Sequence, residues 1–202
     1  MIAIIDYDAG NIRSVEKALQ FLGQEVKITR DREEILEADK VVLPGVGSFG
    51  DAMGKLHQYG LVEVIRQVAE KKTPFLGICL GLQLLFERSD ESPGGGRPGD
   101  PEGRDLTDPG GRGAQDPPYG LEFPGASESG TVSLQGYPGS LMCTSSIAYY
   151  LKARDEQIVK ATTEYGVTIH ASVEQDNIFA CQFHPEKSSD TGLKILKNFV
   201  EL

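Results

Sequence analysis

The chain has 202 residues, a formal net charge of −10 and three cysteines. This length fits one domain with a substantial core, and the acidic balance argues against binding to nucleic acid or to anionic membranes. No apolar run approaches the ~20 residues of a membrane span, and the start of the chain lacks the basic residues of a signal peptide. Three cysteines, one of them expected to work as a thiolate, favour a reducing, cytoplasmic location.

The hydrophobic pattern predicts strands alternating with helices. In chain order we expect a strand over 1–6, a helix from Asn11 to Leu22 ended by Gly23, strands over 25–29 and 40–43 with a short acidic helix between them, helical structure over 51–70, a strand over 74–78, three strands within 157–183 and a closing helix over 191–202. Such alternation predicts a single α/β domain with a mostly parallel central sheet covered by helices on both faces.

The strongest motif begins where the apolar strand 74–78 ends. Gly77-Ile-Cys79-Leu-Gly81 leads from that strand into a helix-like segment. A sharp strand-to-helix turn needs small residues on both sides of its apex, because the strand and helix backbones crowd any Cβ there. The apex side chain is then exposed above the sheet edge, and the N–H of Leu80 points into the same space. We therefore expect a nucleophile elbow at Cys79.

A base for this thiol is offered about a hundred residues later. His184 ends an apolar strand pattern, and Glu186 follows two residues on, where it can bond the second ring nitrogen and fix the orientation of the ring. Cysteine, histidine and carboxylate together predict a catalytic triad.

Each motif also has an ordinary structural explanation. A lone Gly-x-Cys-x-Gly is more often a buried thiol near a tight turn, and a lone His-Pro-Glu is more often a strand-ending turn. Their joint occurrence at the ends of two predicted strands, where open α/β sheets place their sites, favours catalysis. The remaining residues of these types lack such settings: Cys181 is expected in the strand core, Cys143 has no comparable surroundings, and His57 and His170 are expected on the surface.

The combination of Gly77-x-Cys79-x-Gly81 with His184-x-Glu186 resembles the class I (triad) glutamine amidotransferases. Five stretches are similar to the glutaminase subunits of imidazole glycerol phosphate synthase, an enzyme of histidine biosynthesis: residues 5–11, 43–49, 77–87, 161–166 and 182–188. The resemblance covers about 1–92 and 149–202. It implies a flavodoxin-like class I amidotransferase fold, hydrolysis of glutamine to glutamate and ammonia, and a heterodimer with a (β/α)8-barrel cyclase that uses the ammonia. It implies no cofactor and no metal.

The resemblance also implies further site residues. The loop Pro44-Gly-Val-Gly47, otherwise interpretable as an ordinary glycine turn, would form an oxyanion hole through Gly47 together with the N–H of Leu80. Glutamine would be held by three residues: Gly45, Gln83 and Glu91.

Two candidates for the surface that faces the cyclase are Asn11 and Lys187. Their alternative, and that of Glu91, is a role as ordinary solvated polar residues. Two alternatives remain for the whole chain: the glutaminase of another pathway, such as anthranilate, aminodeoxychorismate or pyridoxal phosphate synthesis, and a non-catalytic remnant that only binds the cyclase.

The middle of the chain departs from the family. From Ser92 to Ser140, 21 of 49 residues are Gly or Pro, against 14 in the other 153. Such a composition does not build a packed core and is typical of disorder. The family has a Pro-His-Met-Gly-Trp-Asn motif in this region, and no tryptophan occurs in this chain. We therefore expect 93–148 to be an aberrant segment.

A shifted reading frame explains this departure. Codons for 116–123 can be chosen so that reading from the second base gives Ile-Pro-His-Met-Gly-Trp-Asn, and the same offset over 96–105 permits Gly-Leu-Gly-Ile-Leu-Lys-Gly-Glu. A different offset over 139–148 permits Phe-Ser-Tyr-Val-Tyr-Phe-Val-His-Ser. The hypothesis is that 93–148 is a frameshifted translation of an ordinary family gene; the alternative is a real lineage-specific insertion.

Overall fold

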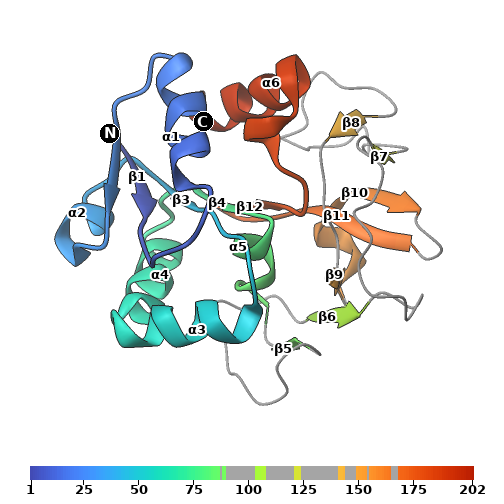
Figure 1. Cartoon of the computed structure of the whole chain (residues 1–202), viewed down its shortest axis with the longest axis horizontal. Coiled ribbons are helices and arrows are strands. Elements are labelled where there is room, and N and C mark those ends of the chain that lie inside the picture. Colours follow the sequence, from blue (N-terminus) through green and yellow to red (C-terminus); the bar gives the residue numbers. More distant parts are fainter. Residues whose placement is uncertain are drawn as a thin grey trace.

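The computed structural model describes residues 1–86, 150–153, 155–164 and 168–202, together with the backbone of the strand segments 88–89, 103–107, 121–123, 141–143 and 149. A seven-stranded sheet forms its centre, in the order β10-β11-β12-β4-β3-β1-β2 (Figure 1). The strands are β1 (Ile2–Ile5), β2 (Val26–Thr29), β3 (Lys40–Leu43), β4 (Phe75–Ile78), β10 (Val159–Glu164), β11 (Thr168–Gln175) and β12 (Ile178–Cys181). The strands from β12 to β2 are parallel, whereas β10 and β11 are antiparallel. The predicted, mostly parallel sheet is confirmed.

Helices cover both faces of this sheet (Figure 1). They are α1 (Ile12–Phe21), α2 (Arg32–Leu36), α3 (Phe49–Gln58), α4 (Leu61–Glu70), α5 (Leu80–Gln83) and α6 (Ser189–Val200), with the 3-10 turns η1 (Glu156–Ile158) and η2 (Pro185–Lys187). Alternate residues of β1 enter different cores: Ile2 and Ile4 pack in the cluster with α1 and α6, while Ala3 and Ile5 pack in the cluster with α2, α3 and α4. Burial on both faces explains why β1 is a continuous apolar run.

Smaller strands flank the main sheet. A three-stranded sheet contains β5 (Arg88–Ser89), β6 (Gly103–Thr107) and β9 (Tyr149–Ala153), and a separate pair contains β7 (Leu121–Phe123) and β8 (Leu141–Cys143). Apart from β6, β7 and β8, the predicted aberrant segment 93–148 lies outside the described residues.

Two expectations need correction. The helical stretch expected over 51–70 is two helices, α3 and α4. Gly60 between them has φ 67°, a left-handed conformation that does not continue a helix. His170 is not on the surface: it is buried in β11, and its Nδ1 accepts the Ala153 N–H at 3.0 Å, because β9 packs over that strand. His57 is exposed, as expected. Within the described parts of the chain, no helix is both long and apolar enough to cross a membrane.

Candidate active site

Four neighbouring parallel strands bring the predicted site residues to one edge of the sheet. β12, β4, β3 and β1 lie side by side and run in the same direction. Their carboxyl ends therefore release four segments at the same edge, the usual place for a site in an open α/β sheet. These segments are the loop 6–11, the loop 44–48, Cys79 and the run 182–188.

Cys79 occupies the sharp turn between β4 and α5. Its backbone has φ 54° and ψ −107°, a conformation that costs energy for a residue with a side chain and is found where function requires it. A Cβ on Gly81 would lie 1.9 Å from the Leu43 carbonyl oxygen, and one on Gly77 would lie 2.9 Å from the Gly81 carbonyl oxygen. The Cys79 N–H donates to the Cys181 carbonyl at 2.8 Å, which fixes the turn to β12. The geometry is that of the expected elbow.

His184 and Glu186 stand together after β12. The His184 ring is almost completely buried, and its Nδ1 lies 2.8 Å from Glu186 Oε1. Asn11, which begins α1, donates from its side-chain amide to the same oxygen at 2.5 Å. The other oxygen, Oε2, is buried and has no hydrogen-bond partner among the described residues. Bonding at Nδ1 leaves the Nε2 side of the ring for the thiol.

The environment of His184 favours its charged form. Burial lowers the pKa of the imidazole, but hydrogen bonds to Cys79 and Glu186, together with the charges of both groups, outweigh burial and raise the pKa to about 9. At neutral pH the ring is therefore an imidazolium, which can stabilise a thiolate beside it and deliver a proton to a leaving group.

Two glutamine side chains extend the site from the thiol. Gln182 donates from Nε2 to Cys79 Sγ at 3.7 Å, and its carbonyl oxygen accepts from Gln83 Nε2 at 3.3 Å. Gln83 is buried in α5, so the predicted glutamine-binding residue orients Gln182 in this structure. Gln182 was not predicted from sequence, although its position between the β12 strand and His184 was a signal.

The predicted oxyanion hole is not assembled. The N–H of Leu80 donates to the Gly45 carbonyl at 3.4 Å. The donor expected to face an oxyanion is therefore already hydrogen-bonded within the protein. Gly47 has φ 107°, which a residue with a side chain would adopt only with strain. Tyr7, from the loop after β1, donates its hydroxyl to the Pro44 carbonyl at 2.8 Å. This second contact to the loop was also missed from sequence.

The predicted partner-facing residues differ in their surroundings. Asn11 is bound to Glu186, so it belongs to the triad's surroundings as well as to the molecular surface, while Lys187 is exposed. Glu91 lies outside the described residues.

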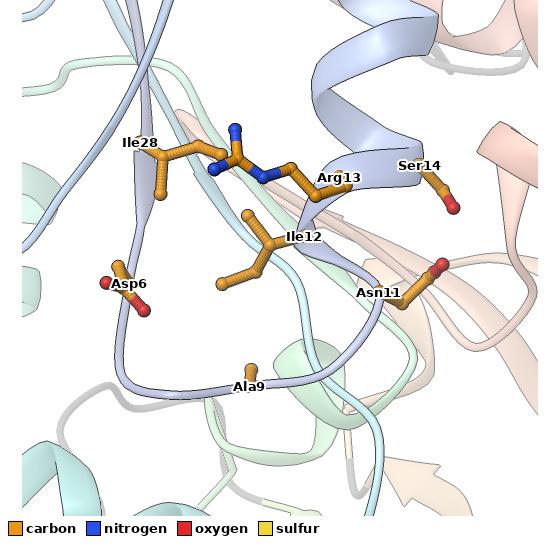
Figure 2. Close-up of a pocket in the computed structure, with 7 residues that line it drawn as sticks. All are labelled: Asp6, Ala9, Asn11, Ile12, Arg13, Ser14 and Ile28. Carbon is orange, nitrogen blue, oxygen red and sulfur yellow. The ribbon is translucent and has the colours of Figure 1, made fainter.

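A pocket of about 310 Å³ lies between the loop 6–11, the start of α1 and Ile28 of β2 (Figure 2). It is lined by Asp6, Ala9, Asn11, Ile12, Arg13, Ser14 and Ile28. Asn11 turns its side chain away from the middle of this pocket, toward Glu186. The pocket thus adjoins the triad's support without reaching Cys79.

Comparison with known proteins defines the class of this site. The family model of glutamine amidotransferase class-I matches residues 3–202, and the chain belongs to that family. A crystal structure described as a glutamine amidotransferase shares the fold, with a TM-score of 0.77 at 22% identity, and the match covers 100% of this chain and 98% of that one.

Within that family, the chain is similar to proteins named imidazole glycerol phosphate synthase subunit HisH. The protein of that name from Moorella thermoacetica is 47% identical, over 100% of this chain and 94% of its own length. The one from Caldanaerobacter subterraneus is 44% identical, over 100% of this chain and 98% of its own length.

Proposed function

We propose that this chain is the glutaminase subunit of an imidazole glycerol phosphate synthase, an enzyme of histidine biosynthesis. It hydrolyses glutamine to glutamate and ammonia and passes the ammonia to a cyclase subunit. The observation that carries the proposal is the elbow cysteine beside a histidine that a buried glutamate orients, in a chain 47% identical to a subunit of that name.

The proposed reaction uses the three triad residues in two steps. The Cys79 thiolate attacks the side-chain amide carbon of glutamine, and the His184 imidazolium protonates the leaving ammonia. His184, now neutral, takes a proton from water as it attacks the γ-glutamyl thioester, which releases glutamate and returns the thiolate. Glu186 holds the ring through Nδ1 in both steps.

Glutamine binding and oxyanion stabilisation are assigned to α5 and the loop 44–47. The Leu80 N–H and a backbone N–H of that loop, for which Gly47 is the candidate, receive the negative oxygen of the tetrahedral intermediate. Because the Gly45 carbonyl accepts the Leu80 N–H, this loop must turn before the donors can act. Gly45, Gln83 and Glu91 are assigned to the binding of glutamine.

The partner is a cyclase subunit in a heterodimer, with Asn11 and Lys187 on the surface that faces it. The cyclase uses ammonia to form imidazole glycerol phosphate and the aminoimidazole carboxamide ribonucleotide. A location in the cytoplasm, where such a thiol stays reduced, fits this role.

The test is Cys79→Ala in the complex with the cyclase subunit. We expect glutamine-dependent synthesis to fall by at least about 10⁴-fold, because no nucleophile remains, while synthesis from added ammonia persists. Cys181→Ala is the matched control, since its thiol is buried in the core and donates to a backbone carbonyl. Equal glutamine turnover by Cys79→Ala and the parent chain would contradict the proposal.

A remnant that only docks the cyclase is the competing function. It is favoured by the composition of 92–140, where 21 of 49 residues are Gly or Pro. A stable complex with no glutamine turnover, even with the cyclase ligand present, would support it. Co-purification with a different synthase subunit would instead support a glutaminase of another pathway.

We also propose that 93–148 is a frameshifted translation of an ordinary family gene. The motifs recovered by two reading-frame offsets support this origin. Sequencing the coding DNA across codons 88–152 tests it: compensating insertions or deletions are expected, and a reading that confirms the present sequence would favour a lineage-specific insertion.

A further inference from the structure

Tyr7 is a buried phenol that reaches the loop 44–47 from the end of the neighbouring strand β1. It follows β1, is 2% exposed, and packs in the same cluster as Phe49 and Leu80. Its hydroxyl donates to the Pro44 carbonyl at 2.8 Å, across 37 positions of sequence. The phenol therefore links the loop after β1 to the loop after β3.

The hydroxyl of Tyr7 also lies directly against Gly45. A Cβ added to Gly45 would be 2.1 Å from that oxygen and 3.1 Å from the Cβ of Leu80. Both atoms are close enough that only glycine fits without a shift of the loop. The α-carbon of Gly45 is thus confined between Tyr7 and the first residue of α5.

This contact marks the boundary between fixed and free backbone. On one side, the ring of Pro44 fixes its φ and Tyr7 holds its carbonyl. On the other side, Val46 is 40% exposed and is flanked by two glycines, which permit backbone rotation. Rotation of the peptide between Gly45 and Val46 would release the Leu80 N–H without moving the peptide between Pro44 and Gly45.

We propose that Tyr7 is a positioning residue for the oxyanion loop: its hydroxyl pins the Pro44–Gly45 peptide, so that the next peptide turns about a fixed point beside Cys79. The inference rests on the proposed glutaminase function and adds a residue to it. Tyr7 acts through the loop and does not itself contact the glutamine carbonyl.

The electrostatics of the site keep this donor in place. Burial, and then the charge of Cys79, raise the pKa of Tyr7 well above its usual range. The phenol therefore stays protonated over the pH range in which the enzyme is assayed. Its hydrogen bond to the Pro44 carbonyl persists over the same range.

The experiment is Tyr7→Phe, which keeps the ring and removes the hydroxyl. In the complex with the cyclase we expect kcat for glutamine hydrolysis to fall by about 10-fold, a fraction of the loss seen when an oxyanion donor is removed, with KM within about 2-fold. The rate of Cys79 alkylation by iodoacetamide should stay within about 2-fold, because alkylation needs the thiolate and no oxyanion hole. Tyr59→Phe is the matched control: its hydroxyl donates to exposed Asp8, and all three quantities should stay within 2-fold.

A second readout does not depend on turnover. In Tyr7→Phe, amide hydrogen exchange over 45–47 should accelerate while the amides of β3 keep their parent rates. If the parent complex hydrolyses no glutamine, the proposed function fails, and this exchange measurement alone decides the role of Tyr7. Unchanged exchange over 45–47, unchanged kcat, or a parallel fall of kcat and alkylation would overturn it.

Gly45→Ala approaches the same contact from the loop and carries the test if Tyr7→Phe does not fold. Its added Cβ pushes on the Tyr7 hydroxyl, so we expect the same fall in kcat with unchanged alkylation. Full activity in Gly45→Ala would show that the contact does not set the loop.

Discussion

The two sides of the active site are in different states. On the triad side, His184 Nδ1 lies 2.8 Å from Glu186 Oε1, and Cys79 and Glu186 together outweigh burial and raise the pKa of His184 to about 9. On the oxyanion side, the N–H of Leu80 donates to the Gly45 carbonyl. The predicted triad side is therefore assembled, while the Leu80 N–H predicted to stabilise a tetrahedral intermediate is bonded to the protein itself.

The difference follows from what holds each side. The triad residues extend from β4 and β12, adjacent strands in the middle of the sheet, and the Cys79 N–H is tied to the Cys181 carbonyl. The loop 44–47 contains two glycines and an exposed Val46, and its contact to Leu80 is long at 3.4 Å. The predicted reactive groups thus follow strands, whereas the predicted oxyanion donors lie on a glycine-containing loop and at the start of α5.

Among changes on either side of the site that keep Cys79, removal of the base His184 should lower the rate of glutamine hydrolysis most. For His184→Ala we expect kcat for glutamine hydrolysis to fall by about 10³-fold, within the range for loss of a general acid and base. Cys79 alkylation at pH 7 should fall as well, because the thiolate loses its cationic partner.

His57→Ala is the control for this change, since His57 is exposed on α3. Steady-state turnover and iodoacetamide labelling measure the two rates. Alkylation at the parent rate in His184→Ala would contradict the assignment of the imidazolium as the partner of the thiolate.

Loss of the carboxylate should weaken the triad side in a pH-dependent way. Glu186→Gln removes a charge that helps to raise the pKa of His184 to about 9, so the pKa should move back toward 6.5. A raised pKa contributes stability that is complete below pH 6.5 and is lost as pH rises through 9. The full shift corresponds to on the order of 3 kcal/mol, of which Glu186 supplies part.

Histidine NMR titration and urea unfolding at several pH values measure this change. The difference in the free energy of unfolding between the parent chain and Glu186→Gln should shrink between pH 6.5 and 9. A difference that grows over that interval would show that the carboxylate does not favour the imidazolium.

Gln182 offers a smaller test of the triad side. Gln182→Met keeps the length of the side chain and removes the amide that donates to Cys79 Sγ. We expect the rate of Cys79 alkylation at pH 7 to fall, because a donor to the sulfur is lost, and kcat to fall by about 10-fold. Iodoacetamide labelling measures the first rate, and an unchanged rate would mean that the amide only packs against the sulfur.

The sharp turn at Cys79 and the contact between His184 and Glu186 could be predicted from sequence because each depends on local spacing. Glycines at 77 and 81 mark the turn, and a carboxylate two residues after His184 is near enough in sequence to reach that ring. Periodicity similarly predicted the parallel sheet and its helices. These features need knowledge of one segment at a time.

The missed contacts depend on how separate segments meet. Tyr7 bonds Pro44 because β1 and β3 are neighbours, and Gln182 reaches Cys79 because β12 lies beside β4. The Leu80 N–H likewise meets the Gly45 carbonyl because β3 lies beside β4. His170 was misplaced for the same reason, since its burial comes from the packing of β9 over β11.

The smallest effect is expected at Asp8, an exposed residue of the loop 6–11. Asp8 accepts from Tyr59, Arg30 and Lys55, which hold the pKa of its carboxyl well below the usual range, and its backbone is left-handed at φ 63°. Asp8→Asn removes the charge and keeps a residue that tolerates this backbone.

Exposed ion pairs contribute little and are screened by salt, so we expect kcat within about 2-fold and little change in Tm. Asp8 is exposed and adjacent to buried Tyr7. Comparing the variants of these two residues therefore distinguishes the exposed face of the loop from its buried face. A fall in kcat for Asp8→Asn as large as that for Tyr7→Phe would mean that the whole loop, and not the buried phenol, positions Pro44. Steady-state turnover of both variants at low and high salt measures this difference, since only an effect that passes through Asp8 should change with salt.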